Sequence, residues 1–470
     1  MKELFWMSAE ELLKAYKRKK LSPLEVTRAL LERVEKVNPK INAIVTLNPE
    51  EAIKKAKSAE RAYARGSKIG KLEGIPLGIK DLVYTRGIRT TFGSRLYKDF
   101  IPDEDAVLVE RVRREGGIIL GKTNTPELGL IPVTDNSVFG PTRNPWNTER
   151  TSGGSSGGSA AGVAAGFFPF AEGSDGGGSI RIPSALCGVF GIKPTFGRIP
   201  NYPHLPGWET MGHEGVIARR VEDAALLLDV MVGHDPRDRH SLPDVGYSFR
   251  KAIQGKVKGM KLAYSPDLGY VPAVDPEVRD LSYRGAKVFE GLGCKVEEVK
   301  LALPNMEPDL LIQVISETVT ATENRLEEWK ELAFPLYLPF LGLVNTFKPQ
   351  DIIRVQYHRE ELWDKVRRVF ERFDLLLCPT TAVAAFPIQP PGPMGPSIID
   401  GKQVGPVSWI CFTFPFNFTG QPAGTVPCGM NSEGLPVGLQ LAGKMYDEVS
   451  IFRAAAAFQE ARPWPFPNSL

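Results

Sequence analysis

Two serines, Ser155 and Ser179, stand on separate glycine-rich turns in the stretch TSGGSSGGSAAGVAAGFFPFAEGSDGGGSIRIPSALCGVFGIKPT. Gly176–Gly178 precede Ser179 and have no side chains, so several backbone N–H groups can converge beside its hydroxyl as an oxyanion site. Ser179 is therefore a candidate nucleophile for acyl transfer. A neutral serine attacks slowly unless a base takes its proton, and no histidine precedes His204. The base must come from another residue type.

Lys80 follows a short apolar run, 75–79, that we expect to form a buried strand. Burial disfavours the ammonium form, so the pKa of Lys80 should fall and leave some neutral amine to accept a proton. Taken singly, both features have ordinary alternatives. A lysine after an apolar strand is more often a surface residue, and a glycine-rich serine turn is more often a tight loop.

Three segments occur together in one order and spacing, namely GIPLGIKD, PTRNPWNTERTSGGSSGGSAAGVAAG and GSDGGGSIRIPSALCGVFGIKPT. In these segments the chain resembles the amidase signature family. The resemblance extends to NPKINAIVTL near the N-terminus and to GQPAGTVPCGMNSEGLPVGLQLAGKMYDE near the C-terminus. It implies an amide hydrolase that forms an acyl-enzyme, with Ser179 as nucleophile, Ser155 as a bridging serine on a cis peptide bond, and Lys80 as general base.

The resemblance also implies residues that assist this triad. The oxyanion donors would be the backbones of Gly176, Gly177, Gly178 and Ser179, and the supporting residues would be Ser156, Asp175 and Arg181. For Asp175 and Arg181, an ordinary ion pair that steadies the loop is an equal alternative. Gly176 departs from the family pattern, in which Thr or Ile is usual at this position. We therefore expect a more flexible oxyanion loop.

The fold class predicted from the pattern of elements is α/β. Helices are expected over about 1–65, with capping signatures at Ser8 and Ser22, followed by alternating short strands and helices. No linker-like segment divides the 470 residues, so we expect one domain, with a catalytic core over about 66–240 and a variable pocket region over about 305–400. The resemblance implies a mixed β-sheet core covered by helices on both faces.

Two other motifs point to different protein classes. Gly116–Thr123 matches the P-loop pattern GxxxxGK[ST]. However, a charged helix is expected before it, and the apolar run 118–120 is itself the predicted strand, so a nucleotide site is disfavoured. Gly153–Gly157 matches the GxSxG nucleophile elbow, which would make Ser155 the nucleophile of an α/β-hydrolase-type esterase. The polar segment before it and the lack of a histidine in a catalytic context disfavour that alternative.

Composition narrows the partners and the location. The chain has 58 basic and 55 acidic residues, a balance that predicts no nucleic-acid partner. Its longest apolar stretch, 332–344, contains two prolines and is too short to span a membrane. Five widely spaced cysteines and an N-terminus without a signal peptide's apolar core predict a cytoplasmic protein with reduced thiols. No metal-binding spacing is present, and the proposed chemistry needs no cofactor.

The substrate is predicted only by class. The family's variable segment corresponds to about 305–348, and here it carries an apolar cluster that includes Leu336, Tyr337 and Phe340. This cluster predicts an apolar or aromatic acyl or aryl substrate, with 412–421 as a further source of aromatic surface. The cluster could equally pack as core or as the contact of a homodimer. Anilides, esters and carbamates (urethanes) stay open beside simple amides.

One relative within the resemblance has a different function. The A subunit of the tRNA-dependent glutamine amidotransferase shares the catalytic core but uses glutamine and works with partner subunits. Its glutamine-binding segment, similar to AEASSNLARYDG, has no match after Ile315, where this chain reads SETVTATENRLEEWKEL. A stand-alone hydrolase of a small-molecule amide is therefore favoured.

Overall fold

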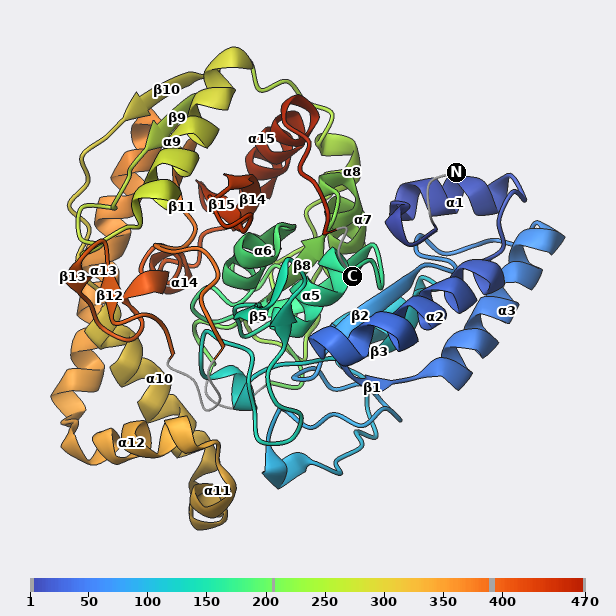
Figure 1. The fold of residues 1–470 in the computed structure, drawn as a ribbon, viewed down its shortest axis with the longest axis horizontal. Coiled ribbons are helices and arrows are strands. Elements are labelled where there is room, and N and C mark those ends of the chain that lie inside the picture. Colours follow the sequence, from blue (N-terminus) through green and yellow to red (C-terminus); the bar gives the residue numbers. More distant parts are fainter. Residues whose placement is uncertain (1–3, 205–207, 389–393, 468–470) are drawn as a thin grey trace.

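The computed structural model describes residues 4–204, 208–388 and 394–467, apart from the side chains of Phe340 and Leu341. Its main feature is a mixed sheet (Figure 1). In spatial order the strands are β1 (Ile44–Leu47), β3 (Ile118–Thr123), β2 (Pro76–Lys80), β6 (Phe170–Asp175), β8 (His213–Ala218), β7 (Phe190–Lys193), β14 (Ala423–Met430), β15 (Pro436–Gly443), β11 (Leu375–Pro379), β9 (Lys261–Tyr264) and β10 (Lys295–Glu298).

Pairing in this sheet is parallel between β2 and its neighbours β3 and β6, and antiparallel between β6 and β8. Strands β2 and β6 meet through one pair only, Gly78 opposite Ala171, and diverge beyond it. Two smaller sheets pair β4 (Arg143–Asn144) with β5 (Asn147–Thr151) and β12 (Ile398–Ile399) with β13 (Lys402–Gln403). The divergence of β2 and β6 opens a space at the end of β2, where Lys80 lies.

Helices cover both faces of the sheet, as predicted. On β15, a Cβ at Gly438 would meet Ala185 of α6 (Arg181–Cys187), whereas the adjacent Leu439 faces Gly285 of α9 (Pro276–Gly291). Since neighbouring strand residues point to opposite faces, α6 and α9 lie on opposite sides. Helix α5 (Gly157–Ala164) packs beside α6, and α15 (Glu448–Ala461) lies with α9 and α7 (Val221–Met231).

The N-terminal helices are α1 (Ala9–Lys17), α2 (Pro23–Ile41) and α3 (Pro49–Arg65), and they lie near the β1 end of the sheet (Figure 1). Both predicted capping boxes are present: Ser8 pairs with Glu11, and Ser22 pairs with Glu25. Helix α2 extends to Ile41, with Pro39 in its last turn.

A helical arm projects from the opposite side of the sheet (Figure 1). It contains α10 (Glu307–Thr322), α11 (Leu326–Leu332), α12 (Leu338–Leu341) and α13 (Pro349–Arg372), with α10 packed against α13. The remaining helices are α4 (Val107–Arg114), α8 (Phe249–Ala252) and α14 (Pro415–Phe418), and short 3-10 turns cover Leu4–Trp6, Arg95–Tyr97, Glu127–Gly129, Glu323–Arg325, Pro335–Tyr337, Gly342–Thr346 and Ser408–Ile410.

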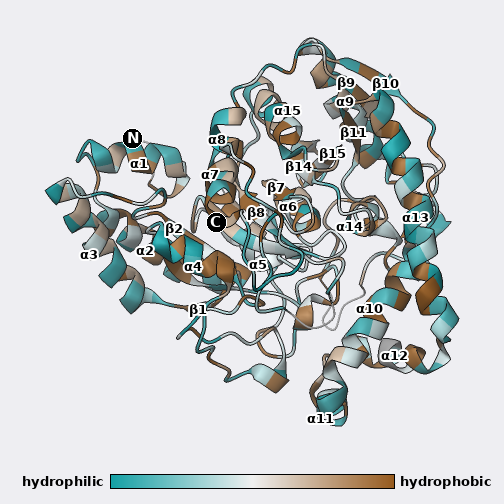
Figure 2. Cartoon of the chain, turned by 180° about the vertical axis from the view of Figure 1, so that it is seen from behind, coloured by the Kyte–Doolittle hydropathy of each residue, from teal (hydrophilic) through white to brown (hydrophobic). Residues whose placement is uncertain are grey.

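Figure 2 shows polar residues along outer helices such as α3 and α13. None of the helices in the described part of the chain combines the length and the apolar character that crossing a bilayer requires. The five cysteines, Cys187, Cys294, Cys378, Cys411 and Cys428, are all buried and unpaired.

The structure explains why neither competing motif forms its site. Within Gly116–Thr123, the last six residues form β3, and Lys122 is fully buried. Its ammonium donates to Val83 O, Thr85 Oγ1 and Thr90 Oγ1, so it cannot reach a phosphate. Ser155 follows β5 of a small hairpin, whereas a nucleophile elbow follows a strand of the central sheet.

We predict that Gly158→Ala destabilises the fold, because this glycine lets α5 pack against β3 and β1. A Cβ there would lie 2.2 Å from Asn124 N and 2.6 Å from Ala43 O. Backbone atoms cannot move aside cheaply, so the free energy of unfolding should fall by about 1–3 kcal/mol. Urea unfolding measures this. The matched control is Gly291→Ala, whose new Cβ meets nothing within 4 Å; an equal loss in both variants would contradict the close-contact explanation.

Candidate active site

Three sequence-predicted residues come together where β2 ends and two helices begin. Lys80 is the last residue of β2, Ser155 lies between β5 and α5, and Ser179 lies between β6 and α6. Lys80 Nζ is 2.7 Å from Ser155 Oγ. The peptide bond between Gly154 and Ser155 is cis, as the resemblance implied.

Lys80 is fully buried. Burial lowers its pKa to about 8, an effect that the nearby Glu172, Glu214 and Asp175 partly oppose. Besides Ser155, its Nζ contacts Ser174, at 2.9 Å from the hydroxyl and 3.4 Å from the carbonyl oxygen. A substantial share of neutral amine at mildly basic pH follows from this environment.

The two serines differ in their surroundings. The Ser155 side chain is 2% exposed, whereas Ser179 is 8% exposed and lines a cavity. In the part of the chain that the structure describes, no hydrogen bond joins their hydroxyls. The connection runs instead through Ser156, whose N–H donates to Ser179 O at 3.1 Å and whose hydroxyl donates to Ser174 O at 3.0 Å. Ser156 therefore ties the two serine turns to each other and to β6.

The predicted oxyanion loop has two kinds of backbone donor. The N–H of Gly178 donates to Asp175 Oδ1 at 2.7 Å, and that of Ile180 donates to Asp175 Oδ2 at 3.1 Å. Among described residues, the N–H groups of Gly176, Gly177 and Ser179 have no partner. Gly178 thus differs from the expectation: it has a φ of +129°, and its N–H turns inward to the carboxylate.

Asp175 and Arg181 form a fully buried ion pair at 2.9 Å. Arg181 also donates to Thr413 O, Gln440 Oε1 and Asn417 Oδ1. Burial by itself would raise the pKa of Asp175, but the Arg181 guanidinium, together with Lys193 and Asn417, holds that pKa well below its usual range. The structure thus places both residues behind the loop, where they hold its backbone and do not face the cavity.

Gly176 packs closely against Trp208, a contact that the sequence did not predict. A Cβ at this position would lie 2.2 Å from the indole ring of Trp208. The indole Nε1 donates to Leu128 O at 3.1 Å, which fixes the ring against the loop. The glycine therefore makes room for Trp208, a residue that lies far along the sequence and gave no local signal.

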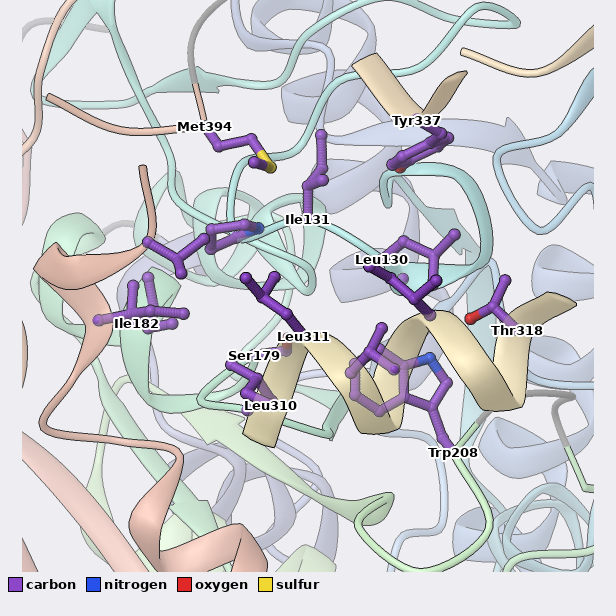
Figure 3. Close-up of a pocket in the computed structure, with 17 residues that line it drawn as sticks. Leu130, Ile131, Ser179, Ile182, Trp208, Leu310, Leu311, Thr318, Tyr337 and Met394 are labelled. Atoms are coloured by element: carbon purple, nitrogen blue, oxygen red, sulfur yellow. The ribbon is translucent and has the colours of Figure 1, made fainter. Parts of the chain in front are cut away.

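The cavity beside Ser179 contains about 790 Å³ of empty space, including open solvent at its mouth. Figure 3 shows Ser179 next to Leu310 and Leu311 of α10, with Thr318 farther along the same helix. The other lining residues are Gly129, Leu130, Ile131, Pro132, Gly177, Ile182, Trp208, Val314, Ile315, Tyr337, Met394, Val407 and Ile410. Among these described residues, Tyr337 is the sole one with an ionisable side chain.

The predicted pocket residues are only partly in this cavity. Tyr337 lines it, but Leu336 lines a separate small cavity with Val133 and Phe386, because adjacent residues of the 3-10 turn point in different directions. The side chain of Phe340 lies outside the described residues. Helix α10 contributes more lining residues than any other helix, and the aromatic residues of 412–421 are buried and do not line the cavity.

One carboxylate fastens the arm to the site. The Glu127 carboxylate accepts hydrogen bonds from Trp329 Nε1 at 2.9 Å and from the N–H of Phe334 at 2.7 Å, and the Glu127 carbonyl oxygen accepts from the hydroxyl of Tyr337 at 3.1 Å.

The described residues contain no group of three or more His, Cys, Asp or Glu side chains that could hold a metal ion.

We predict that Arg181→Met lowers the free energy of unfolding by about 3–5 kcal/mol, because it leaves a buried, uncompensated carboxylate. The lowered pKa of Asp175 means that this stabilisation is present above the ordinary aspartate range and is lost as pH falls toward the lowered value. Urea unfolding at neutral pH measures the effect. In the control Arg284→Met, which breaks an exposed pair with Asp280, the loss should stay below about 1 kcal/mol. Similar losses in both variants would contradict the argument.

Comparisons with known proteins identify the family. The Amidase family model matches residues 25–452. An acylamidase from Rhodococcus erythropolis is 39% identical over 98% of this chain and 96% of its own length. The A subunit of glutamyl-tRNA(Gln) amidotransferase from Moorella thermoacetica is 36% identical over 98% of this chain and 97% of its own.

Solved structures give the same result. A bacterial aryl acylamidase of the amidase signature family superposes with a TM-score of 0.92 at 36% identity, covering 98% of this chain and 97% of that one. A 6-aminohexanoate cyclic dimer hydrolase superposes with a TM-score of 0.90 at 30% identity, covering 99% of both chains. The chain therefore belongs to the amidase signature family and is an amide-hydrolysing enzyme.

Proposed function

We propose that the protein hydrolyses amides of apolar acyl or aryl groups through an acyl-enzyme on Ser179, with Ser155 as relay and Lys80 as base. The observation that carries this proposal is the 2.7 Å contact between the fully buried amine of Lys80 and Ser155 Oγ. A buried lysine with a pKa near 8 can accept a proton near neutral pH. No other basic group is needed.

In the proposed first step, neutral Lys80 takes the proton of Ser155 while Ser155 takes the proton of Ser179. Ser179 Oγ attacks the carbonyl carbon, and the proton returns through Ser155 to the leaving amine. Water then repeats the relay and releases the acid. The hydroxyls of Ser155 and Ser179 need to come into hydrogen-bonding contact when substrate binds, since catalytic contacts are often longer without substrate.

The oxyanion would be held by the N–H groups of Gly177 and Ser179, which line the cavity and, like that of Gly176, have no partner among the described residues. The Asp175 carboxylate fixes the backbone on either side of Ser179 through Gly178 and Ile180. A donor pair held rigid in this way needs little reorganisation when negative charge develops. Gly176 would contribute space for Trp208.

The shape of the cavity supports an elongated apolar group. Leu310, Leu311, Val314, Ile315 and Thr318 form one face of α10, spaced over two turns. At 1.5 Å of rise per residue this face is about 12 Å long, so it fits a medium chain or a substituted ring. The acyl group of the substrate is expected to lie along this face of α10, because Ser179 lies at one end of it.

A glutamine amidotransferase subunit is the second candidate, and the relative from Moorella thermoacetica favours it. Glutamine carries an ammonium and a carboxylate, which require charged partners. In the described lining of the cavity, no acidic or basic side chain offers one. Glutaminase activity comparable to anilide hydrolysis would reverse this preference.

The direct test is nitroaniline release from short-chain, long-chain and aromatic acyl nitroanilides and a nitrophenyl carbamate. We predict that Ser179→Ala reduces kcat by at least about a thousandfold and that Lys80→Met and Ser155→Ala do the same.

In the wild type, the rate should fall about tenfold per pH unit below the Lys80 pKa of about 8. A rate that stays level down to mildly acidic pH would contradict the role of Lys80.

We further predict that Thr318→Phe shortens the cavity. Thr318 is buried and lies about 12 Å along α10 from Leu310. The variant should therefore lower kcat/KM for long acyl nitroanilides about tenfold or more and leave short ones nearly unchanged. Thr320→Phe, on the exposed side of the same helix, is the matched control. A uniform loss across chain lengths would show that the acyl group does not extend along α10.

A further inference from the structure

The carboxyl groups of Glu172 and Glu214 lie beside Lys80 and have no part in the mechanism above. Glu172, on β6, is fully buried, and its Oε2 accepts the backbone N–H of Lys80 at 2.8 Å. Strands β2 and β6 have already diverged at this point. The Glu172 carboxyl therefore fills the gap between them and supplies the acceptor that a neighbouring strand would otherwise provide.

Glu214 lies on the next strand, β8, directly opposite Ser174. Because Glu172 and Ser174 are two residues apart on β6, all three side chains share one face of the sheet. Glu172 and Glu214 are diagonal neighbours on this face, a position from which long side chains can interact, and each carboxyl affects the pKa of the other. Glu172 Oε1 and Glu214 Oε2 are buried and have no partner among the hydrogen bonds of the described residues.

Two carboxylates cannot hydrogen-bond to each other, since both only accept. One of the pair must carry a proton, and the environment selects Glu214. Burial and the neighbouring Glu172 raise the pKa of Glu214 well above its usual range, and burial raises that of Glu172 to a lesser extent, because Lys80 and Lys122 oppose it. The pair then has one negative charge.

The other charges near Lys80 are already paired. Lys122, on β3, donates to oxygens of Val83, Thr85 and Thr90, and its charge lowers the pKa of Glu172. Asp175, at the end of β6, is in its ion pair with Arg181. The net charge of Glu172 and Glu214 is therefore the electrostatic influence on Lys80 that changes when one proton binds or leaves.

We infer that Glu172 and Glu214 share one proton and act as a positioning pair that sets the basicity of Lys80. A single negative charge partly offsets the effect of burial. Two charges would hold Lys80 as an ammonium and stop the relay, and no charge would make its amine too weak a base. This inference rests on the proposed role of Lys80 as base.

The first experiment measures the rate of Ser179 modification by a fluorophosphonate against pH, read by intact mass. Glu214→Gln keeps the single charge, so its acid limb should match that of the wild type. The double variant Glu172→Gln/Glu214→Gln has no charge, so its acid limb should move about one unit to lower pH. Glu290→Gln, on the surface of α9, is the control.

Two outcomes of this experiment would overturn the inference. If Glu214→Gln alone moves the limb as far as the double variant does, Glu214 carries a charge and the proton is not shared. If the double variant leaves the limb in place, the pair does not act on Lys80. Thermal unfolding of each variant verifies that it is folded.

A second measurement does not depend on Ser179 chemistry. The infrared difference spectrum between wild type and Glu214→Gln at neutral pH should contain the carbonyl band of a protonated carboxylic acid. Absence of that band would contradict the inference that the two carboxyls share one proton, even if the double variant fails to fold. Failure of the wild type to react with the fluorophosphonate would instead count against the proposed function, and the infrared band would still decide the state of the pair.

Discussion

The arrangement of the active site depends on the burial of one amine, that of Lys80. Lys80 lies at the end of β2 with its whole side chain buried, and its low pKa follows from that burial. A lysine in this position would be costly unless its Nζ had polar partners, which Ser155 and Ser174 provide. Ser155 reaches this nitrogen from the turn before α5, and Ser174 reaches it from β6.

Around this amine, the surrounding groups are arranged to limit motion. Asp175, Arg181 and Asn417 connect the turn before α6 to the segment before β14, so distant parts of the chain hold one short loop. Trp208 packs on the loop from the other side. A site built in this way has its donors in place before substrate arrives, which is the condition for efficient oxyanion stabilisation.

Much of this could be predicted from sequence. The pattern of elements and the family resemblance predicted the α/β class. The glycine-rich turns, the apolar run before Lys80 and the same resemblance predicted that Lys80, Ser155 and Ser179 form one catalytic group. Glu172, Glu214 and Trp208 could not be found, because their roles depend on strand register and on contacts between segments far apart in sequence. Within the predicted pocket segment of about 305–348, the sequence pointed to the cluster around Leu336, Tyr337 and Phe340, whereas α10 supplies more of the lining. The apolar residues of α10 alternate with polar ones and gave a weaker signal.

The attachment of the arm through Glu127 has a consequence for how specificity can diversify. Trp329, Phe334 and Tyr337 all reach this one residue, which belongs to the segment after β3 and not to the arm. The inner edge of the arm is thus fixed by the catalytic half of the molecule. Substitutions on the cavity-facing side of α10 can change the shape of the cavity while the attachment to Glu127 stays in place, so new substrate ranges can evolve while the hydrolytic machinery is inherited intact.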